Sequence, residues 1–227
     1  MKIVAINSSP RGRASNTNVM VEAFLKGARM AKAETVSIFL SEKEIKHCKG
    51  CHACWTRGPG QCVTDDDMPG VLLQMAGADI IVFASPVYFG NISGMLKVFM
   101  DRMTMIGSPH SQKSSGEKRQ ESEPKEAQAP GLIMMANCGF PDVSEFDVVS
   151  LWIKKVCRKV HMDLAAEIYA AQGKFLSSPP EELEPAIADY LLAVESAGRE
   201  IAAGMKISDA AGKKLVQNLT LLTTSTK

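Results

Sequence analysis

The chain has 227 residues, of which 45% are hydrophobic and 22% are charged, and its formal net charge at pH 7 is +1. This balance is typical of a folded globular protein, and the near-neutral charge argues against binding to nucleic acid or to an anionic membrane. The opening MKIVAINSSPRG holds too short an apolar run for a signal peptide, and no apolar stretch is long enough to span a bilayer, so we expect a cytoplasmic protein.

Short apolar segments alternate with amphipathic segments along the chain. Segments rich in β-branched and other apolar residues predict buried strands at residues 2–7, 35–40, 79–84, 131–137 and 164–170. Apolar residues at helical spacing predict helices at residues 19–32, 69–75, 96–103, 146–160 and 181–204. Strands that alternate with helices form a parallel sheet with helices on both faces.

Five such strand–helix units predict a flavodoxin-like α/β fold with three layers, α/β/α, and a five-stranded parallel sheet of order 2-1-3-4-5. We expect a single domain over residues 1–205 and a C-terminal tail over 206–227. Residues 107–129 contain no large apolar residue and are predicted to form a polar excursion from the fold. Right-handed crossovers bring the loops after the first, third and fourth predicted strands to one edge, where a ligand is expected.

The loop after the first predicted strand, NSSPRGRASNT, is dense in polar residues. The hydroxyls of Ser8, Ser15 and Thr17 suit a phosphate, and the Arg11 guanidinium can bind two of its oxygens. The helix that begins near Asn16 adds free N–H groups and its positive dipole end. The alternative is an ordinary strand-to-helix turn in which serine and asparagine cap the helix. The polar residues outnumber what capping requires, so the sequence favours a phosphate site.

Two further loops reach the same edge. In SPVYFGN, after the third predicted strand, Tyr88 and Phe89 suggest a wall for a flat ring, although both side chains could instead cover the core. In NCGFP, after the fourth predicted strand, Gly139 would let the backbone approach a ring closely. A phosphate loop, an aromatic loop and a glycine-containing loop together predict an FMN site.

The motifs S-P-R-x-x-x-S-N-T at 9–17 and S-P-V-Y-F-G at 85–90 resemble the NADPH-dependent FMN reductase group of flavodoxin-like proteins. With its clustered cysteines the chain resembles the iron–sulfur flavoprotein branch, over roughly residues 1–170 and the final helix. The resemblance implies an FMN-binding domain, electron transfer with the flavin as reaction centre, and a homodimer or dimer of dimers with the flavin near the subunit interface. The candidate FMN contacts are Ser9, Arg11, Ser15, Asn16, Thr17, Pro86, Val87, Tyr88, Phe89, Asn91, Asn137 and Gly139.

The segment HCKGCHACWTRGPGQC, residues 47–62, holds four of the six cysteines at the spacing C-x2-C-x2-C-x7-C. In a reducing compartment, clustered cysteines are more often metal ligands or redox groups than disulfides. A [4Fe–4S] cluster needs four thiolates, and the resemblance implies that Cys48, Cys51, Cys54 and Cys62 are its ligands. A zinc ion on the same thiols and a metal-free thiol loop are the alternatives.

Several neighbouring residues have structural interpretations. Gly58-Pro59-Gly60 can turn the chain so that Cys62 rejoins the other three cysteines. Asp65–Asp67 is interpreted as a solvated helix start, Arg102 as a surface residue of its helix, and Trp55 as a local packing residue.

The sequence therefore predicts an FMN-dependent oxidoreductase that passes electrons via FMN, through a [4Fe–4S] cluster where one is present, to a small acceptor. With a cluster, ferredoxin is an expected external donor. Without one, the prediction is an NAD(P)H-dependent reductase of flavins, quinones or nitro compounds. A non-catalytic flavodoxin-like electron carrier is a further alternative, against which the near-neutral charge argues because flavodoxins are typically strongly acidic. A zinc-stabilised interaction module is a third alternative, and it predicts a colourless protein.

Overall fold

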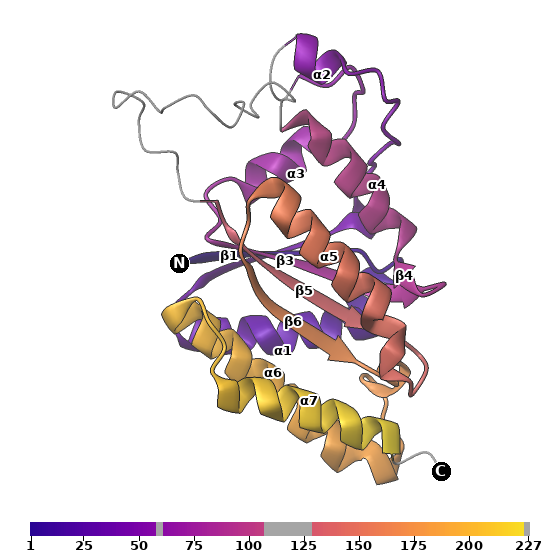
Figure 1. Ribbon diagram of the computed structural model, residues 1–227, viewed down its shortest axis with the longest axis vertical. Helices are drawn as coiled ribbons and strands as arrows, with labels where there is room; N and C mark the ends of the chain where they lie inside the picture. Colours follow the sequence, from indigo (N-terminus) through magenta and orange to yellow (C-terminus); the bar gives the residue numbers. More distant parts are fainter. Residues whose placement is uncertain (58–60, 107–128, 225–227) are drawn as a thin grey trace.

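A parallel sheet runs through the middle of the protein, with helices on both of its faces (Figure 1). The computed structural model describes residues 1–57, 61–106 and 129–224. Within them the sheet has the order β2-β1-β3-β5-β6, with a short strand β4 paired to β3. The strands are β1 (Lys2–Asn7), β2 (Glu34–Phe39), β3 (Ile80–Tyr88), β4 (Asn91–Ile92), β5 (Gly131–Asn137) and β6 (Leu164–Ala170). Apart from β4, this is the predicted order 2-1-3-4-5, so the flavodoxin-like three-layer fold is confirmed.

The helices divide between the two faces of the sheet (Figure 1). One face is covered by α1 (Asn16–Met30), α6 (Glu184–Gly204) and α7 (Asp209–Thr224), and the other by α3 (Met68–Met75), α4 (Gly94–Arg102) and α5 (Asp147–Val160). A short helix, α2 (Ala53–Thr56), lies in the cysteine segment. Short 3-10 turns lie at Gly12–Ala14, Leu40–Glu42, Met103–Met105, Val143–Phe146, Gly173–Phe175 and Glu181–Leu183. No helix in the described ranges combines the length and apolar character needed to cross a membrane.

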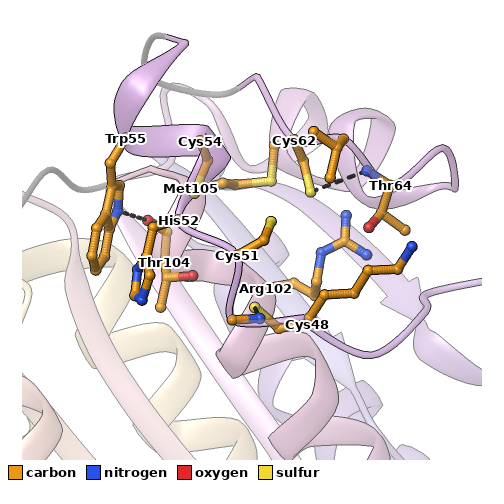
Figure 2. Close-up of a pocket in the computed structure, with 13 residues that line it drawn as sticks. Cys48, Cys51, His52, Cys54, Trp55, Cys62, Thr64, Arg102, Thr104 and Met105 are labelled. Atoms are coloured by element: carbon orange, nitrogen blue, oxygen red, sulfur yellow. Dashed lines mark hydrogen bonds between the residues drawn. The ribbon is translucent and has the colours of Figure 1, made fainter.

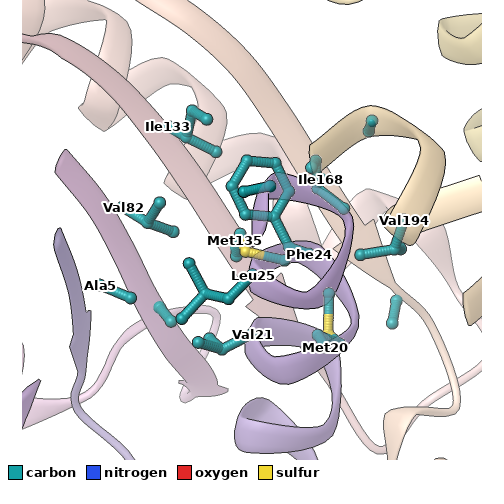
Figure 3. Packing of buried hydrophobic residues seen from close by; sticks show 14 of the residues in the cluster. Ala5, Met20, Val21, Phe24, Leu25, Val82, Ile133, Met135, Ile168 and Val194 are labelled. Atoms are coloured by element: carbon teal, nitrogen blue, oxygen red, sulfur yellow. The ribbon is translucent and has the colours of Figure 1, made fainter. Parts of the chain in front are cut away.

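Each strand sends alternate side chains to the two faces, as the twofold repeat of a strand requires. In β1, Ile3 and Ala5 pack toward α1 and α6, whereas Val4 and Ile6 pack toward α3 and α4. Figure 3 shows the first of these cores, where Phe24 of α1 lies between the sheet and α6. A separate hydrophobic core therefore lies on each face of the sheet.

Helices α1 and α6 meet at two glycines. A Cβ atom on Gly27 would lie 1.8 Å from the carbonyl oxygen of Glu195, and a Cβ atom on Gly198 would lie 1.9 Å from that of Phe24. No side chain fits in so small a space, so each glycine lets the backbone of the other helix come close.

The third strand departs furthest from its predicted bounds, and two predicted segments fall outside the described residues. The third strand does not end at residue 84: it continues to Tyr88 and turns back at Phe89-Gly90 into β4. Both turn residues have positive φ, +50° and +68°, which is the conformation that two-residue hairpins favour. The polar excursion predicted at 107–129 and the Gly58-Pro59-Gly60 turn lie, except for residue 129, outside the described residues.

Candidate functional site

The serines of the polar loop after β1 are buried, and the loop is internally bonded. The Ser15 side chain caps α1, since its oxygen accepts from the N–H of Asn18 (3.1 Å) and its hydroxyl donates to the carbonyl of Gly12 (2.6 Å). The N–H of Ser9 donates to Asn7 Oδ1 (3.0 Å), and the Ser9 hydroxyl oxygen accepts from the N–H of Arg11 (3.4 Å). Several polar groups of the loop therefore stabilise the turn itself, as the capping interpretation predicts.

Other polar side chains join the loops at the carboxyl edge to one another. The Thr17 hydroxyl donates to Asn137 Oδ1 (2.7 Å), which ties the start of α1 to the end of β5. The Ser93 hydroxyl, at the start of α4, lies 3.0 Å from the carbonyl oxygen of Ser8 and 2.9 Å from its hydroxyl. Asn16 Oδ1 accepts from the N–H of Ser177 after β6 (3.1 Å). The loops that follow β1, β3, β5 and β6 thus form one connected edge.

Several donors at this edge are left for a ligand. The first N–H groups of α1, those of Asn16 and Thr17, have no acceptor within the helix. Asn7 Nδ2 is buried and has no hydrogen-bond partner among the described residues. Arg11 is exposed. These groups fit an anion such as the FMN phosphate, because a helix start and a guanidinium both favour negative charge.

The aromatic loop lies at the same edge, on the β3–β4 hairpin (Figure 1). Pro86 is buried and Val87 half-buried, but Tyr88 is 48% exposed and Phe89 is fully exposed. Phe89 therefore does not cover the core, and its ring is free to contact a ligand. Asn91 and Gly139 are also exposed. The structure brings the predicted contacts to one edge, and their role in FMN binding stays a prediction.

The four clustered cysteines line one cavity of about 120 Å³ (Figure 2). All four are free thiols, half-buried at Cys54 and Cys62 and exposed at Cys48 and Cys51. Two of the sulfurs accept backbone N–H groups: Cys48 Sγ from Gly50 (3.5 Å) and Cys62 Sγ from Thr64 (3.4 Å). The chain therefore surrounds a hollow with four thiols.

Charge links these thiols to one another. Burial raises the pKa of the Cys54 thiol, and negative charge on Cys62, Cys48 and Cys51 adds to the rise. Burial would also raise the pKa of the Cys62 thiol, but hydrogen bonds from Thr64 and the charge of Arg102 outweigh it and hold that pKa below its usual value. If all four cysteines were deprotonated, as metal ligands must be, their charges would repel one another, and a bound cation would remove that repulsion.

The cysteine loop is closed at its base by paired contacts. The N–H of Asp67 donates to the carbonyl of Glu44 (3.0 Å), and the N–H of Glu44 donates to Asp67 Oδ2 (2.8 Å). One step inward, the N–H of Lys46 donates to Asp66 Oδ2 (2.9 Å). At the far end of the loop, Trp55 Nε1–H donates to the carbonyl of Thr104 (3.0 Å), so Trp55 anchors α2 to the segment after α4.

Two sequence interpretations are wrong at this loop. Arg102 does not lie on the surface, and Asp66 is not solvated: their side chains are 1% and 0% exposed and form an ion pair. Arg102 Nη2 donates to Asp66 Oδ1 (3.1 Å) and Nη1 to the carbonyl of Lys46 (3.0 Å). One sequence signal pointed to this burial, because Arg102 follows the buried Leu96 and Phe99 at three-residue intervals on one face of α4.

In the described ranges, no three His, Cys, Asp or Glu side chains stand close enough together to hold a single metal ion. A [4Fe–4S] cluster makes a different demand, since each thiolate binds a separate iron corner and the sulfurs stand further apart. Four thiols around one hollow, two of them receiving backbone N–H groups, fit that donor set.

The fold and the polar and aromatic loops at its carboxyl edge define a flavodoxin-like protein. The chain belongs to the NADPH-dependent FMN reductase family, whose sequence model matches residues 1–121, just over half of the chain. The resemblance to this family is thereby confirmed.

Individual relatives agree with that family. An iron–sulfur flavoprotein of Archaeoglobus fulgidus is 42% identical over 105 residues, which are 46% of this chain and 50% of that protein. One of Methanosarcina thermophila is 40% identical over 106 residues, 47% of this chain and 54% of that protein. The chain thus spans about half the length of the curated relatives it matches. An NAD(P)H:quinone oxidoreductase from Methanothermobacter marburgensis has the same fold, with a TM-score of 0.62 at 14% identity over 88% of this chain and 96% of that one.

Proposed function

We propose that the protein is an FMN-dependent oxidoreductase that passes electrons through FMN at the carboxyl edge, and through a [4Fe–4S] cluster in the cysteine loop, to a small acceptor. The observation that carries the proposal is the single cavity lined by Cys48, Cys51, Cys54 and Cys62 in a chain of the FMN reductase family. The matched iron–sulfur flavoproteins support it.

The chain's own groups have distinct parts in this proposal. Arg11 and the start of α1 bind the phosphate, Tyr88 and Phe89 shield the ring, and Gly139 exposes backbone beside it. The four cysteines hold the cluster. When bound, FMN supplies hydride and single-electron chemistry and the cluster supplies single-electron transfer. No side chain need act as general acid or base.

Helix α4 connects the two candidate sites. It begins at the Ser93–Ser8 contact on the carboxyl edge and ends at Arg102 beside the cysteine cavity. Its nine residues make it about 13 Å long. One short, rigid element therefore separates the proposed flavin site from the proposed cluster site.

Donor and assembly belong to the same proposal. NAD(P)H or a ferredoxin is the electron donor, and the protein works in the cytoplasm as a homodimer or a dimer of dimers, with the flavin near the subunit interface. The family name supports NAD(P)H as the donor, and the resemblance supports the dimer with the flavin near its interface.

The test is an absorption spectrum of anaerobically purified protein, with iron, sulfide, zinc and FMN assayed on the same sample. The expected result is about four irons and four sulfides per FMN. The Cys62→Ala variant should lose iron, whereas Cys157→Ala, a change on the core-facing side of α5, should keep it. Flavin without iron would instead indicate a cluster-free NAD(P)H-dependent reductase, and a colourless protein that does not take up added FMN would overturn the whole proposal.

A further inference from the structure

A buried arginine stands at the wall of the cysteine cavity. Arg102 is the last residue of α4, its side chain is 1% exposed, and it lines the cavity together with the four cysteines (Figure 2). Burying a guanidinium is costly unless its charge and its donors are satisfied. The groups that pair with the charge and the N–H donors of Arg102 therefore indicate its role.

Two of the three guanidinium nitrogens bond to residues at the base of the cysteine loop. Nη1 donates to Lys46 and Nη2 to Asp66, and Asp66 completes a bidentate pair with the same two nitrogens. Lys46 precedes the first cysteine and Asp66 follows the last, so Arg102 joins both ends of the loop to α4.

One donor remains. Arg102 Nε is buried and has no hydrogen-bond partner among the described residues. The guanidinium lies beside the Cys62 thiol, and both charge and side-chain hydrogen bonding link the two groups. Figure 2 shows the guanidinium on the side of the hollow where Cys62 lies. An unpaired donor is uncommon in a folded interior because it has lost its hydrogen bonds to water without gaining a partner. A sulfur acceptor bound in the cavity would supply that partner.

We propose that Arg102 is a positioning residue for the cluster, which it serves by donating its spare N–H to sulfur at the Cys62 corner and by placing a positive charge there. This inference rests on the function proposed above. Adding an electron makes a cluster more negative, and a cation and an N–H donor beside its sulfur favour that reduced state. Arg102 therefore raises the midpoint potential of the cluster, and it holds Cys62, the ligand furthest along the chain from the other three.

The test compares clusters in three variants reconstituted under anaerobic conditions. In the double variant Arg102→Gln/Asp66→Asn the buried pair is removed together, so neither charge is left alone and the net charge is unchanged. Arg102→Lys keeps the charge but lacks the guanidinium N–H. Lys97→Gln is the control, because it removes an exposed cation of the same helix that pairs with Asp101.

Iron content and the midpoint potential of the loaded fraction, followed by electron paramagnetic resonance, are the readouts. We expect the double variant to bind iron about 10- to 100-fold more weakly, because losing the hydrogen-bond partner of a metal ligand commonly has an effect of that size. We also expect its remaining cluster to have a more negative potential. Arg102→Lys should shift the potential in the same direction by less, and Lys97→Gln should match the wild type.

The outcomes separate this inference from the proposed function. A purely structural role would lower the iron content but leave the loaded clusters at the wild-type potential, and that result overturns the inference while the cluster stands. A double variant that takes up no iron leaves the decision to Arg102→Lys, whose unshifted potential overturns the inference equally. A wild type that binds no iron overturns the cluster and this inference with it.

Discussion

Single polar residues in this protein carry contacts between distant segments. Thr17 and Asn137 are 120 positions apart, and Arg102 and Asp66 are 36 apart, yet each pair is bonded in the interior. A local sequence pattern contains no sign of such partners. The sequence placed Thr17 at the carboxyl edge as a candidate phosphate contact, which stays a prediction, and the structure adds that its hydroxyl donates to Asn137.

The hydrogen bond from Thr17 to Asn137 should contribute both to stability and to FMN binding. In Thr17→Val the hydroxyl is lost while the branched shape is kept, so Asn137 Oδ1 stays buried without its donor. We expect the free energy of unfolding to fall by about 1–3 kcal/mol, and FMN to bind more weakly because the start of α1 is no longer tied to β5. Urea unfolding and fluorescence titration with FMN measure the two effects.

Thr35→Val is the matched control, since the Thr35 hydroxyl accepts from Arg29 at the surface and valine suits a strand. Its unfolding free energy should stay within about 0.5 kcal/mol of the wild type. Equal losses in the two variants would contradict a special role for the Thr17–Asn137 bond.

At the scale of whole elements, the apolar pattern of the sequence predicted strand bounds reliably where the strand lies in the core. The strands β5 and β6 begin and end at the predicted residues, because every position of β5 is buried and its apolar run stops at polar loops. Burial on both faces leaves a strand little freedom of register. The same logic failed at β3, which continues beyond its apolar run into the hairpin. Phe89 has a left-handed conformation that an aromatic residue rarely adopts, so nothing in the sequence SPVYFGN predicted the turn.

The close crossing of α1 and α6 should make Gly27 intolerant of a larger side chain. In Gly27→Ala the added methyl group would meet the backbone of α6, so the two helices must move apart. We expect a loss of about 3 kcal/mol in unfolding free energy, at the upper end of overpacking effects. Chemical denaturation of purified protein measures it.

Gly70→Ala is the control for that substitution, because Gly70 also lies in a helix but has no atom within 4 Å of an added Cβ. Its stability should be unchanged or slightly raised, since alanine favours a helix over glycine by up to about 1 kcal/mol. If both alanines behaved alike, the close crossing would not be what fixes the glycine at position 27.

Across the whole molecule, the sheet and its two cores are separate from the cysteine loop. Cys54 and Cys62 pack against the core on the α3–α5 side without being part of it, and the loop is closed at Glu44 and Asp67 by reciprocal bonds. The alternation of strands and helices was enough to predict this frame. It was not enough to predict the loop's attachment, because the pair that fixes it joins a helix end to a residue on another segment.

This separation predicts that the protein folds without the loop. A variant in which a short Gly/Ser link joins Glu44 to Asp67, combined with Arg102→Gln so that no buried charge is left alone, should remain folded and bind FMN while holding no iron. Circular dichroism, thermal melting and cofactor assays test it. The same deletion with Arg102 retained should melt at a lower temperature, and a loss of folding in both would show that the loop is part of the frame.

A loop whose two ends are already bonded to each other is a unit that genes can gain or lose in one event. Inserting such a segment between two neighbouring positions costs little loop entropy and disturbs no strand. One further point substitution, to an arginine at the end of the adjacent helix, then fastens it. Transplanting residues 44–67 together with that arginine into a flavin protein that has no such segment would therefore transfer the whole proposed cluster site in two changes.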